Sequence, residues 1–118
     1  MEAPSPSLKG VSSKRTFALL RTSGRRARSG PVAVHYVPAP PADGSCYVAY
    51  GVPRRVGTAV ERNTYRRRLR AVAREAVGAV PAGTYLIGVG PGVRDVSFQE
   101  LRRRVIDTMS RASGIERQ

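Results

Sequence analysis

The chain of 118 residues has one cysteine, one histidine and no tryptophan. A single cysteine, Cys46, excludes a disulfide framework and a zinc finger, and it fits a reducing, cytoplasmic location. No apolar run is long enough for a transmembrane helix, and residues 1–13 lack the order of a signal peptide. The eight acids are scattered and form no paired carboxylates of the kind that a two-metal nuclease requires.

Positive charge dominates what is present, because 21 Lys and Arg residues face eight Asp and Glu residues, for a net charge of +13. Such a field favours polyanionic partners, namely RNA, DNA or an anionic membrane surface. Nineteen of the basic residues are arginine, whose guanidinium binds phosphate with two N–H groups and stacks on bases. We expect a disordered leader over residues 1–13, a single domain over 14–112 and a frayed tail over 113–118.

Hydrophobic periodicity predicts a small α/β sandwich, with one sheet and helices packed on it. Two capping boxes, at Thr58–Glu61 and Ser97–Glu100, mark the starts of two helices. We expect the first two strands to be antiparallel neighbours and the last strand to lie parallel to the second. The predicted elements are a helix over 13–22, strands over 31–37 and 46–52, a helix over 59–77, a strand over 84–90, a helix from 98 to about 112 and a further short strand in the basic connector at 25–28.

The helix over 59–77 concentrates the positive charge. From Arg54 to Arg74 there are eight arginines and one acid, Glu61. At 100° per residue, one arc of the helix is apolar and a neighbouring arc is basic. Like charges on one face repel, and a merely solvated face would mix signs. The pattern therefore favours a surface that binds nucleic acid or phosphate.

The same stretch carries a family resemblance. Residues 52–70, VPRRVGTAVERNTYRRRLR, resemble the signature of the protein subunit of bacterial ribonuclease P, in which a strand and a basic turn precede Gly-x-Ala-Val-x-Arg-Asn-Arg and a basic run. The chain departs from that signature at Pro53, Glu61 and Thr64. Arg15-x-Phe17 is similar to the start of the family's opening helix, although Arg21 replaces a second aromatic residue. The resemblance spans residues 14–111.

The resemblance implies an α+β two-layer sandwich of order α-β-β-(β)-α-β-α with a left-handed crossover, whereas most crossovers are right-handed. It implies a subunit of an endoribonuclease that matures the 5′ ends of tRNA. The family's catalytic RNA, with Mg²⁺ bound mainly by that RNA, removes the 5′ leader of precursor tRNA by hydrolysis. The polypeptide would bind the RNA subunit one-to-one and hold the single-stranded leader, without cleaving RNA by itself.

The resemblance also assigns residues to two surfaces, and it places no catalytic residue in the protein. The surface that contacts the RNA subunit would comprise Arg54, Arg55, Arg62, Asn63, Arg66, Arg67, Arg70 and Arg74. The cleft that holds the leader would be lined by Phe17, Val34, Tyr36 and Tyr50, where aromatic rings would stack on unpaired bases.

Three other classes remain possible on the residues alone. A ribosomal-type RNA-binding protein without a catalytic partner would also be small and rich in arginine, but it has no need of the motif at 52–70. A helix-turn-helix DNA-binding protein would not place strands between its helices. A membrane-surface helix requires bulky apolar residues opposite its charge, and the helix over 59–77 carries mainly Ala and Val there.

Overall fold

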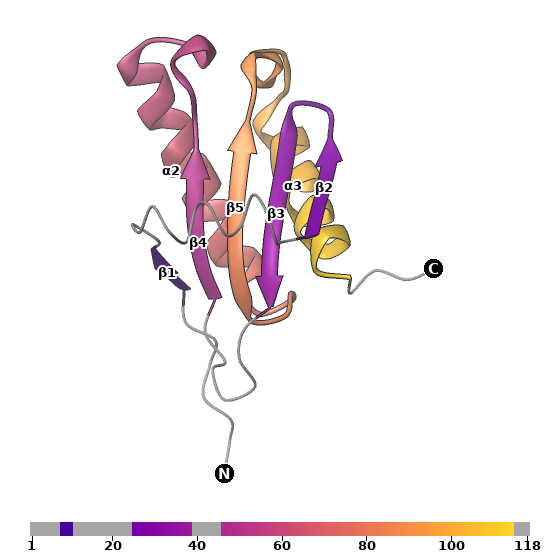
Figure 1. The fold of residues 1–118 in the computed structure, drawn as a ribbon. Helices are drawn as coiled ribbons and strands as arrows, with labels where there is room; N and C mark the ends of the chain where they lie inside the picture. Colours follow the sequence, from indigo (N-terminus) through magenta and orange to yellow (C-terminus); the bar gives the residue numbers. More distant parts are fainter. Residues whose placement is uncertain (1–7, 11–24, 39–45, 115–118) are drawn as a thin grey trace.

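Five strands form one sheet in the computed structural model, which describes residues 8–10, 25–38 and 46–114 (Figure 1). Strand β4 pairs in parallel with β1 and β5, and β3 pairs antiparallel with both β5 and β2. The order across the sheet is β1-β4-β5-β3-β2. The strands are β1 (Leu8–Gly10), β2 (Arg25–Ser29), β3 (Val32–Pro38), β4 (Cys46–Gly51) and β5 (Gly83–Val89).

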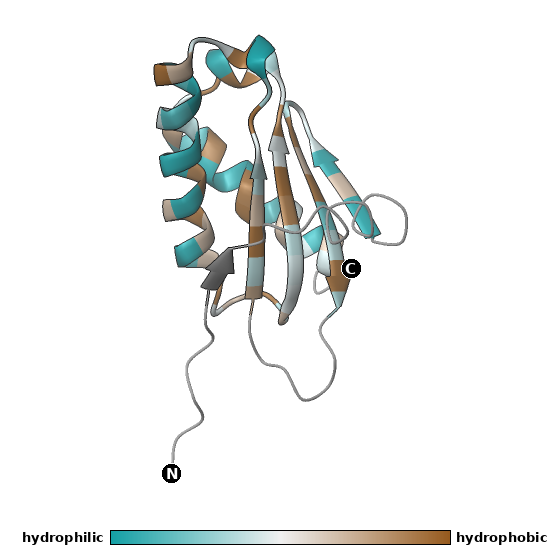
Figure 2. Ribbon diagram, turned by 60° about the vertical axis from the view of Figure 1, so that its left-hand side comes forward, coloured by the Kyte–Doolittle hydropathy of each residue, from teal (hydrophilic) through white to brown (hydrophobic). Residues whose placement is uncertain are grey.

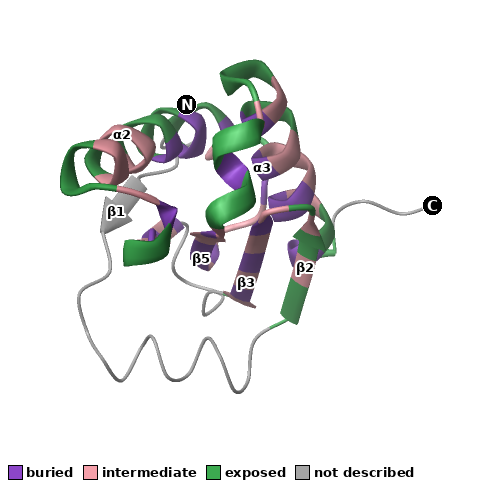
Figure 3. Cartoon of the chain, turned by 90° about the horizontal axis from the view of Figure 1, so that it is seen from above, coloured by how far each residue is buried: buried purple, intermediate pink, exposed green. Residues whose placement is uncertain are grey.

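Two helices, α2 (Ala59–Ala76) and α3 (Phe98–Ser113), cover the same face of this sheet (Figures 1 and 3). Short 3₁₀ turns precede them, η1 (Arg54–Val56) after β4 and η2 (Pro91–Asp95) after β5. In Figure 1, β4 and β5 point upward, α2 lies behind them, and β5 lies to the right of β4. The crossover from β4 through α2 to β5 is therefore left-handed, against the usual preference.

The predicted elements within the described residues are found close to their expected bounds, including the short strand β2. The prediction that β3 and β4 are neighbours is wrong, because β5 lies between them and pairs with both. The connection from Pro38 to Cys46 is long enough to pass one strand, since strands lie only about 5 Å apart. The apolar strand β5 thereby takes the central position, where it is paired on both sides.

Some predictions concern the ends of the chain. Three residues of the predicted disordered leader, Leu8–Gly10, form β1 beside β4. The predicted helix over 13–22 lies outside the described residues. Ser113, where we expected the tail to fray, is the last residue of α3, and Gly114 ends the helix in the left-handed conformation with φ of 79°. In the described part of the chain, no helix is both long and apolar enough to cross a membrane.

The hydrophobic core lies between the sheet and the two helices. Alternation along each strand places one set of side chains in this core and the other set on the opposite face, which we call the second face. From β3, Val32, Val34 and Tyr36 are buried in the core. The helices contribute Leu69, Val72, Ala73 and Ala76 from α2 and Leu101, Val105, Met109 and Ala112 from α3.

Side-chain caps begin both helices. The Thr58 Oγ1 accepts the Glu61 N–H at 3.2 Å, and Glu61 Oε1 accepts the Thr58 N–H at 2.8 Å, so the predicted capping box is complete. At α3, Ser97 Oγ accepts the Glu100 N–H at 3.1 Å. The Glu100 carboxylate binds Arg103 and Arg104 instead of completing the second predicted capping box, which is therefore half formed.

Candidate nucleic-acid interface

Much of the outward side of α2 is hydrophilic (Figure 2), and the sequence of this helix is rich in arginine. Val60, Asn63, Arg66, Arg67 and Arg70 line a shallow groove of about 470 Å³ along the helix. The Arg66 Nη1 donates to Asn63 Oδ1 at 2.9 Å, which joins two of the side chains that line the groove. The groove therefore brings together four members of the basic arc expected from the sequence, whereas the fifth, Arg74, does not line it.

We call the set assigned to RNA binding from the sequence the basic surface, and its members lie in η1 and along α2. Arg54 and Arg55 are exposed in η1, directly before the helix. Arg62 lies in the first turn of α2, where its Nε donates to the Gly57 carbonyl at 3.3 Å. The basic surface comprises Arg54, Arg55, Arg62, Asn63, Arg66, Arg67, Arg70 and Arg74.

No acid of the described residues forms an ion pair with the basic surface. Within the described residues, every ion pair uses an arginine from η2 or α3. These are Arg94–Glu61, Arg102–Glu75, Arg103–Glu100, Arg104–Glu100 and Arg111–Asp107. The protein thus pairs the arginines on one side and leaves those of η1 and α2 available to an external anion.

Arg68 points away from this surface, as the sequence indicated. Its guanidinium carbon lies 5.8 Å from the ring centroid of Tyr65 and 5.5 Å from that of Phe98. Phe98 is the first residue of α3 and is 40% exposed. These cation–π contacts join the two helices.

The three described residues assigned to the leader cleft, Val34, Tyr36 and Tyr50, do not form one. Val34 and Tyr36 face the helices, with Val34 fully buried and Tyr36 only 4% exposed. The Tyr36 hydroxyl donates to the Ala82 carbonyl at 2.9 Å, and burial raises the pKa of this hydroxyl. Phe17 lies outside the described residues.

Tyr50 also belongs to the helix side of the sheet. The guanidinium carbon of Arg70 lies 5.8 Å from the Tyr50 ring centroid, so this ring packs between β4 and α2. Burial raises the pKa of the Tyr50 hydroxyl, and the nearby Arg70 and Arg74 partly oppose that rise. The assignment of Val34, Tyr36 and Tyr50 to a cleft is therefore wrong, since bulky strand residues on their side form the core.

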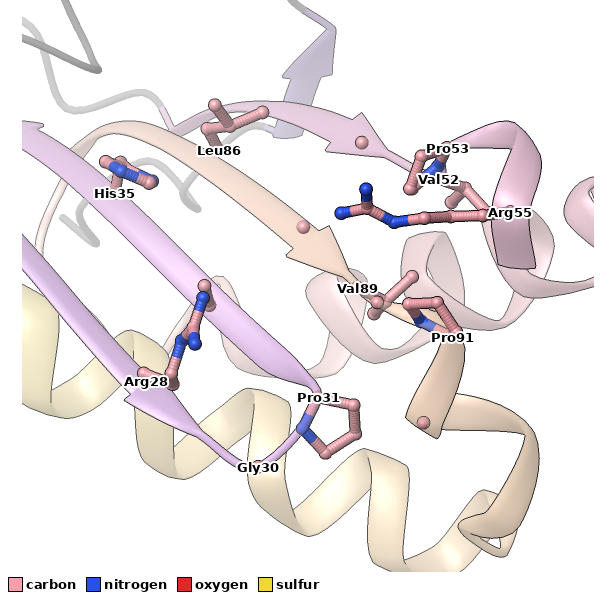
Figure 4. Close-up of a pocket in the computed structure, with 15 residues that line it drawn as sticks. Arg28, Gly30, Pro31, His35, Val52, Pro53, Arg55, Leu86, Val89 and Pro91 are labelled. Carbon is pink, nitrogen blue, oxygen red and sulfur yellow. The ribbon is translucent and has the colours of Figure 1, made fainter.

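A cleft does exist on the second face of the sheet (Figure 4). It has a volume of about 740 Å³, and small residues such as Ala33, Gly51 and Gly88 form its floor. Arg28 of β2 and Arg55 of η1 extend over the sheet from opposite sides. His35 lies on the floor further along β3 (Figure 4). The cleft is thus shallow and basic at its walls.

Two of these cleft residues, Arg28 and His35, were not assigned to the site from the sequence. The alternation of side chains along β3 could have indicated the face of the cleft. Val32, Val34 and Tyr36 form the bulkier of the two alternating sets of side chains in this strand. The bulkier set marks the core side of a half-buried strand, so the second set, with His35, marks the other face. Arg28 is placed there by its register opposite Ala33.

The described residues include no group of three or more His, Cys, Asp or Glu side chains able to hold a metal ion. Cys46 is buried, and its thiol lies 3.7 Å from the Pro81 carbonyl oxygen. Burial raises the pKa of this thiol, which disfavours the nucleophilic thiolate.

Comparison with known proteins places this arrangement in a family. The family model described as Ribonuclease P matches residues 6–113. The ribonuclease P protein component of Clavibacter michiganensis is 32% identical over 103 residues, which cover 86% of this chain and 90% of that protein. The component from Thermus thermophilus is 34% identical over 113 residues, which cover 96% of this chain but only 64% of that protein.

Solved structures share the fold. The Staphylococcus aureus RNase P protein superposes with a TM-score of 0.80 at 13% identity, over 91% of this chain and 97% of that one. The Thermotoga maritima RNase P protein gives a TM-score of 0.78 at 20% identity, over 90% and 99%. With the family match over nearly its whole length, the chain belongs to the ribonuclease P protein family.

Proposed function

We propose that this chain, as a ribonuclease P protein component, binds the RNA subunit of that enzyme one-to-one through the basic surface. The observation that carries the proposal is the charge of η1 and α2, whose arginines have no acidic partner in the described part of the chain, whereas the arginines of α3 have one. Guanidinium groups spaced along one helix face match successive phosphates of an RNA backbone. Asn63 adds a side chain that can both donate and accept hydrogen bonds.

The second-face cleft is proposed to hold the single-stranded 5′ leader of precursor tRNA. Its floor of small residues admits an extended chain, and Arg28 and Arg55 can bind phosphates on both sides. Tyr47 lies on the same face by alternation from the buried Cys46 and Val48. In such a cleft, basic side chains bind the phosphates and aromatic rings stack on the bases, with little preference for base sequence. This property suits an enzyme that accepts many leaders.

We propose that the RNA subunit catalyses the hydrolysis. Mg²⁺ would be held mainly by that RNA and would activate water and stabilise the developing charge. The polypeptide's own residues would bind the RNA subunit and align the leader with the cleavage site. Arg54 and Arg55 are proposed to serve at the junction, because both belong to the basic surface and Arg55 also lines the cleft.

The test is cleavage of precursor tRNA at low Mg²⁺ by a bacterial ribonuclease P RNA, with and without this protein. Correct 5′ cleavage that requires both components is the expected result, and the protein alone should leave the substrate intact. Binding of the RNA without any gain in cleavage would contradict the proposal. That result would favour a structural RNA-binding protein of the ribosomal type.

A further inference from the structure

Two short turns, η1 and η2, form one end of the second-face cleft. Arg55 from η1 and both Pro91 and Gly92 from η2 line it. Val56 and Val93, one from each turn, are fully buried in the same core. Because η1 follows β4 and η2 follows its parallel neighbour β5, the two turns meet at the same edge of the sheet. Their spacing therefore sets the shape of the cleft at this end.

One side chain, Arg94 of η2, joins these turns. Its Nη2 lies 3.0 Å from Glu61 Oε2 in the first turn of α2, and its Nη1 donates to the Val56 carbonyl at 3.5 Å. A single planar guanidinium thus bridges η2, the last residue of η1 and the start of α2. Arginine suits this task because its donors have a fixed geometry.

The carboxylate that Arg94 binds is itself held in place. Glu61 Oε1 accepts the Thr58 N–H at 2.8 Å, and this bond together with Arg94 lowers the pKa of the carboxyl. Gly57 makes room for it, because a Cβ at that position would collide with the Glu61 carboxylate. The sequence Gly57-Thr58-x-x-Glu61 therefore fixes the anion that receives Arg94.

We infer that Arg94 is a positioning residue that holds η1 against η2 and so fixes the wall from which Arg55 enters the cleft. The inference rests on the proposed function, since it concerns how that cleft receives the leader. The ion pair is exposed, with the Arg94 side chain 53% accessible, and exposed pairs contribute little to stability. Its effect should therefore be on the geometry of the cleft rather than on folding.

The experiment measures the affinity of the reconstituted holoenzyme for precursor tRNA with a short leader and for leaderless tRNA. The ratio of the two affinities is the leader preference. Arg94→Ala should lower that preference about three- to tenfold, while the affinity for leaderless tRNA stays unchanged. Glu61→Gln should do the same, because glutamine can keep the capping box but loses the ion pair. In an Arg55→Ala background, Arg94→Ala should have no further effect, since it acts through Arg55.

The matched control is Arg102→Ala, which breaks an ion pair of similar exposure between α3 and α2. Arg102 and Glu75 side chains are 48% and 45% exposed, against 53% and 38% for Arg94 and Glu61. The control should retain the wild-type leader preference. Equal preferences for Arg94→Ala and Arg102→Ala would overturn the inference, as would additive losses from Arg55→Ala and Arg94→Ala.

A second measurement tests the inference even if the leader binds elsewhere. In the free protein, the Val56 N–H donates to the Pro53 carbonyl and the Gly57 N–H to the Arg54 carbonyl. Amide hydrogen exchange at 56 and 57 should be at least several-fold faster in Arg94→Ala and in Glu61→Gln than in Arg102→Ala. Unchanged exchange would show that Arg94 does not hold η1, whatever the function of the cleft.

Discussion

The rings of Tyr36 and Tyr85 lie on neighbouring strands with their centroids 4.8 Å apart and their planes at 41°. The two hydroxyls donate to adjacent carbonyls in the segment after α2, Tyr36 to Ala82 at 2.9 Å and Tyr85 to Pro81 at 2.6 Å. Both rings lie on the helix side of the sheet. This pair therefore ties the helix–strand connection to the core and is not part of a surface that binds bases.

Substitution at Tyr36 should therefore change stability and not leader binding. Tyr36→Phe removes one hydrogen bond and should lower the free energy of unfolding by about 1 kcal/mol. Tyr36→Ala also removes a core ring and should lower it by about 3–5 kcal/mol. Denaturant unfolding of both variants gives these values. A folded Tyr36→Phe protein with weaker leader binding would restore the original cleft assignment.

The burial of three tyrosine side chains predicts that the protein loses stability at high pH. Burial raises the pKa of Tyr36, Tyr50 and Tyr85 above the ordinary value of about 10 that the unfolded chain retains. Their contribution to stability is complete below pH 10 and is lost as the pH rises, because the unfolded state then releases protons that the folded state keeps. Unfolding midpoints between pH 9 and 11.5 should fall, and less so in Tyr85→Phe. Tyrosine absorbance should show these three residues titrating late, and a midpoint independent of pH would contradict this account.

The cleft on the second face predicts that Arg28 and Arg55, rather than Tyr36, contribute to binding of the leader. Arg28→Ala and Arg55→Ala should each weaken binding of a single-stranded leader and each reduce the salt dependence of binding by about one charge. The measurement is the affinity of the holoenzyme for precursor tRNA across a salt series. Tyr36→Phe is the control and should keep the wild-type slope. If the salt dependence of binding were unchanged in both arginine variants, the leader would not bind in this cleft.

The sequence predicted local structure well because its signals are local. The capping box at Thr58, the apolar arc of Leu69 and Val72 and the alternation in β3 each depend on neighbouring residues. The position of β5 between β3 and β4 is a long-range relationship that no short pattern encodes. The burial of five of the seven residues of β5 is consistent with this central position, but the burial itself results from the long-range pairing.

The two parts of the candidate site also differ in whether local sequence patterns could predict them. The basic surface lies mostly on one helix, so helical spacing alone placed Asn63, Arg66 and Arg70 together. The cleft draws on β2, β3, β4, β5 and both turns, and its assembly depends on strand order and on which sheet face the helices cover. Arg94 could not have been linked to Glu61 from the sequence, since 33 residues separate them.

Anions should stabilise the free protein against heat. The arginines of the basic surface repel one another in the folded state without acidic partners, and an anion that binds them shifts the equilibrium toward that state. Sulfate or phosphate should raise Tm by several degrees more than sodium chloride at equal ionic strength, which separates binding from screening. Arg66→Ala with Arg70→Ala should reduce the difference. Equal Tm values in the two salts would contradict specific anion binding.

The basic surface itself is tested by Arg66→Ala combined with Arg70→Ala. Both side chains line the groove on α2 and neither has an acidic partner among the described residues. The double variant should bind the RNA subunit more weakly, and the slope of log affinity against log salt should fall by about two, since two phosphate contacts are lost.

The control for that variant removes the same charge from α3, outside the basic surface. Arg102→Ala with Arg103→Ala also deletes two arginines, but these pair with Glu75 and Glu100. Their loss changes the net charge of the protein equally while leaving the proposed contact surface intact. If RNA binding responded only to net charge, both double variants would weaken it alike. A loss confined to the pair on α2 would establish that position, and not total charge, determines where the RNA binds.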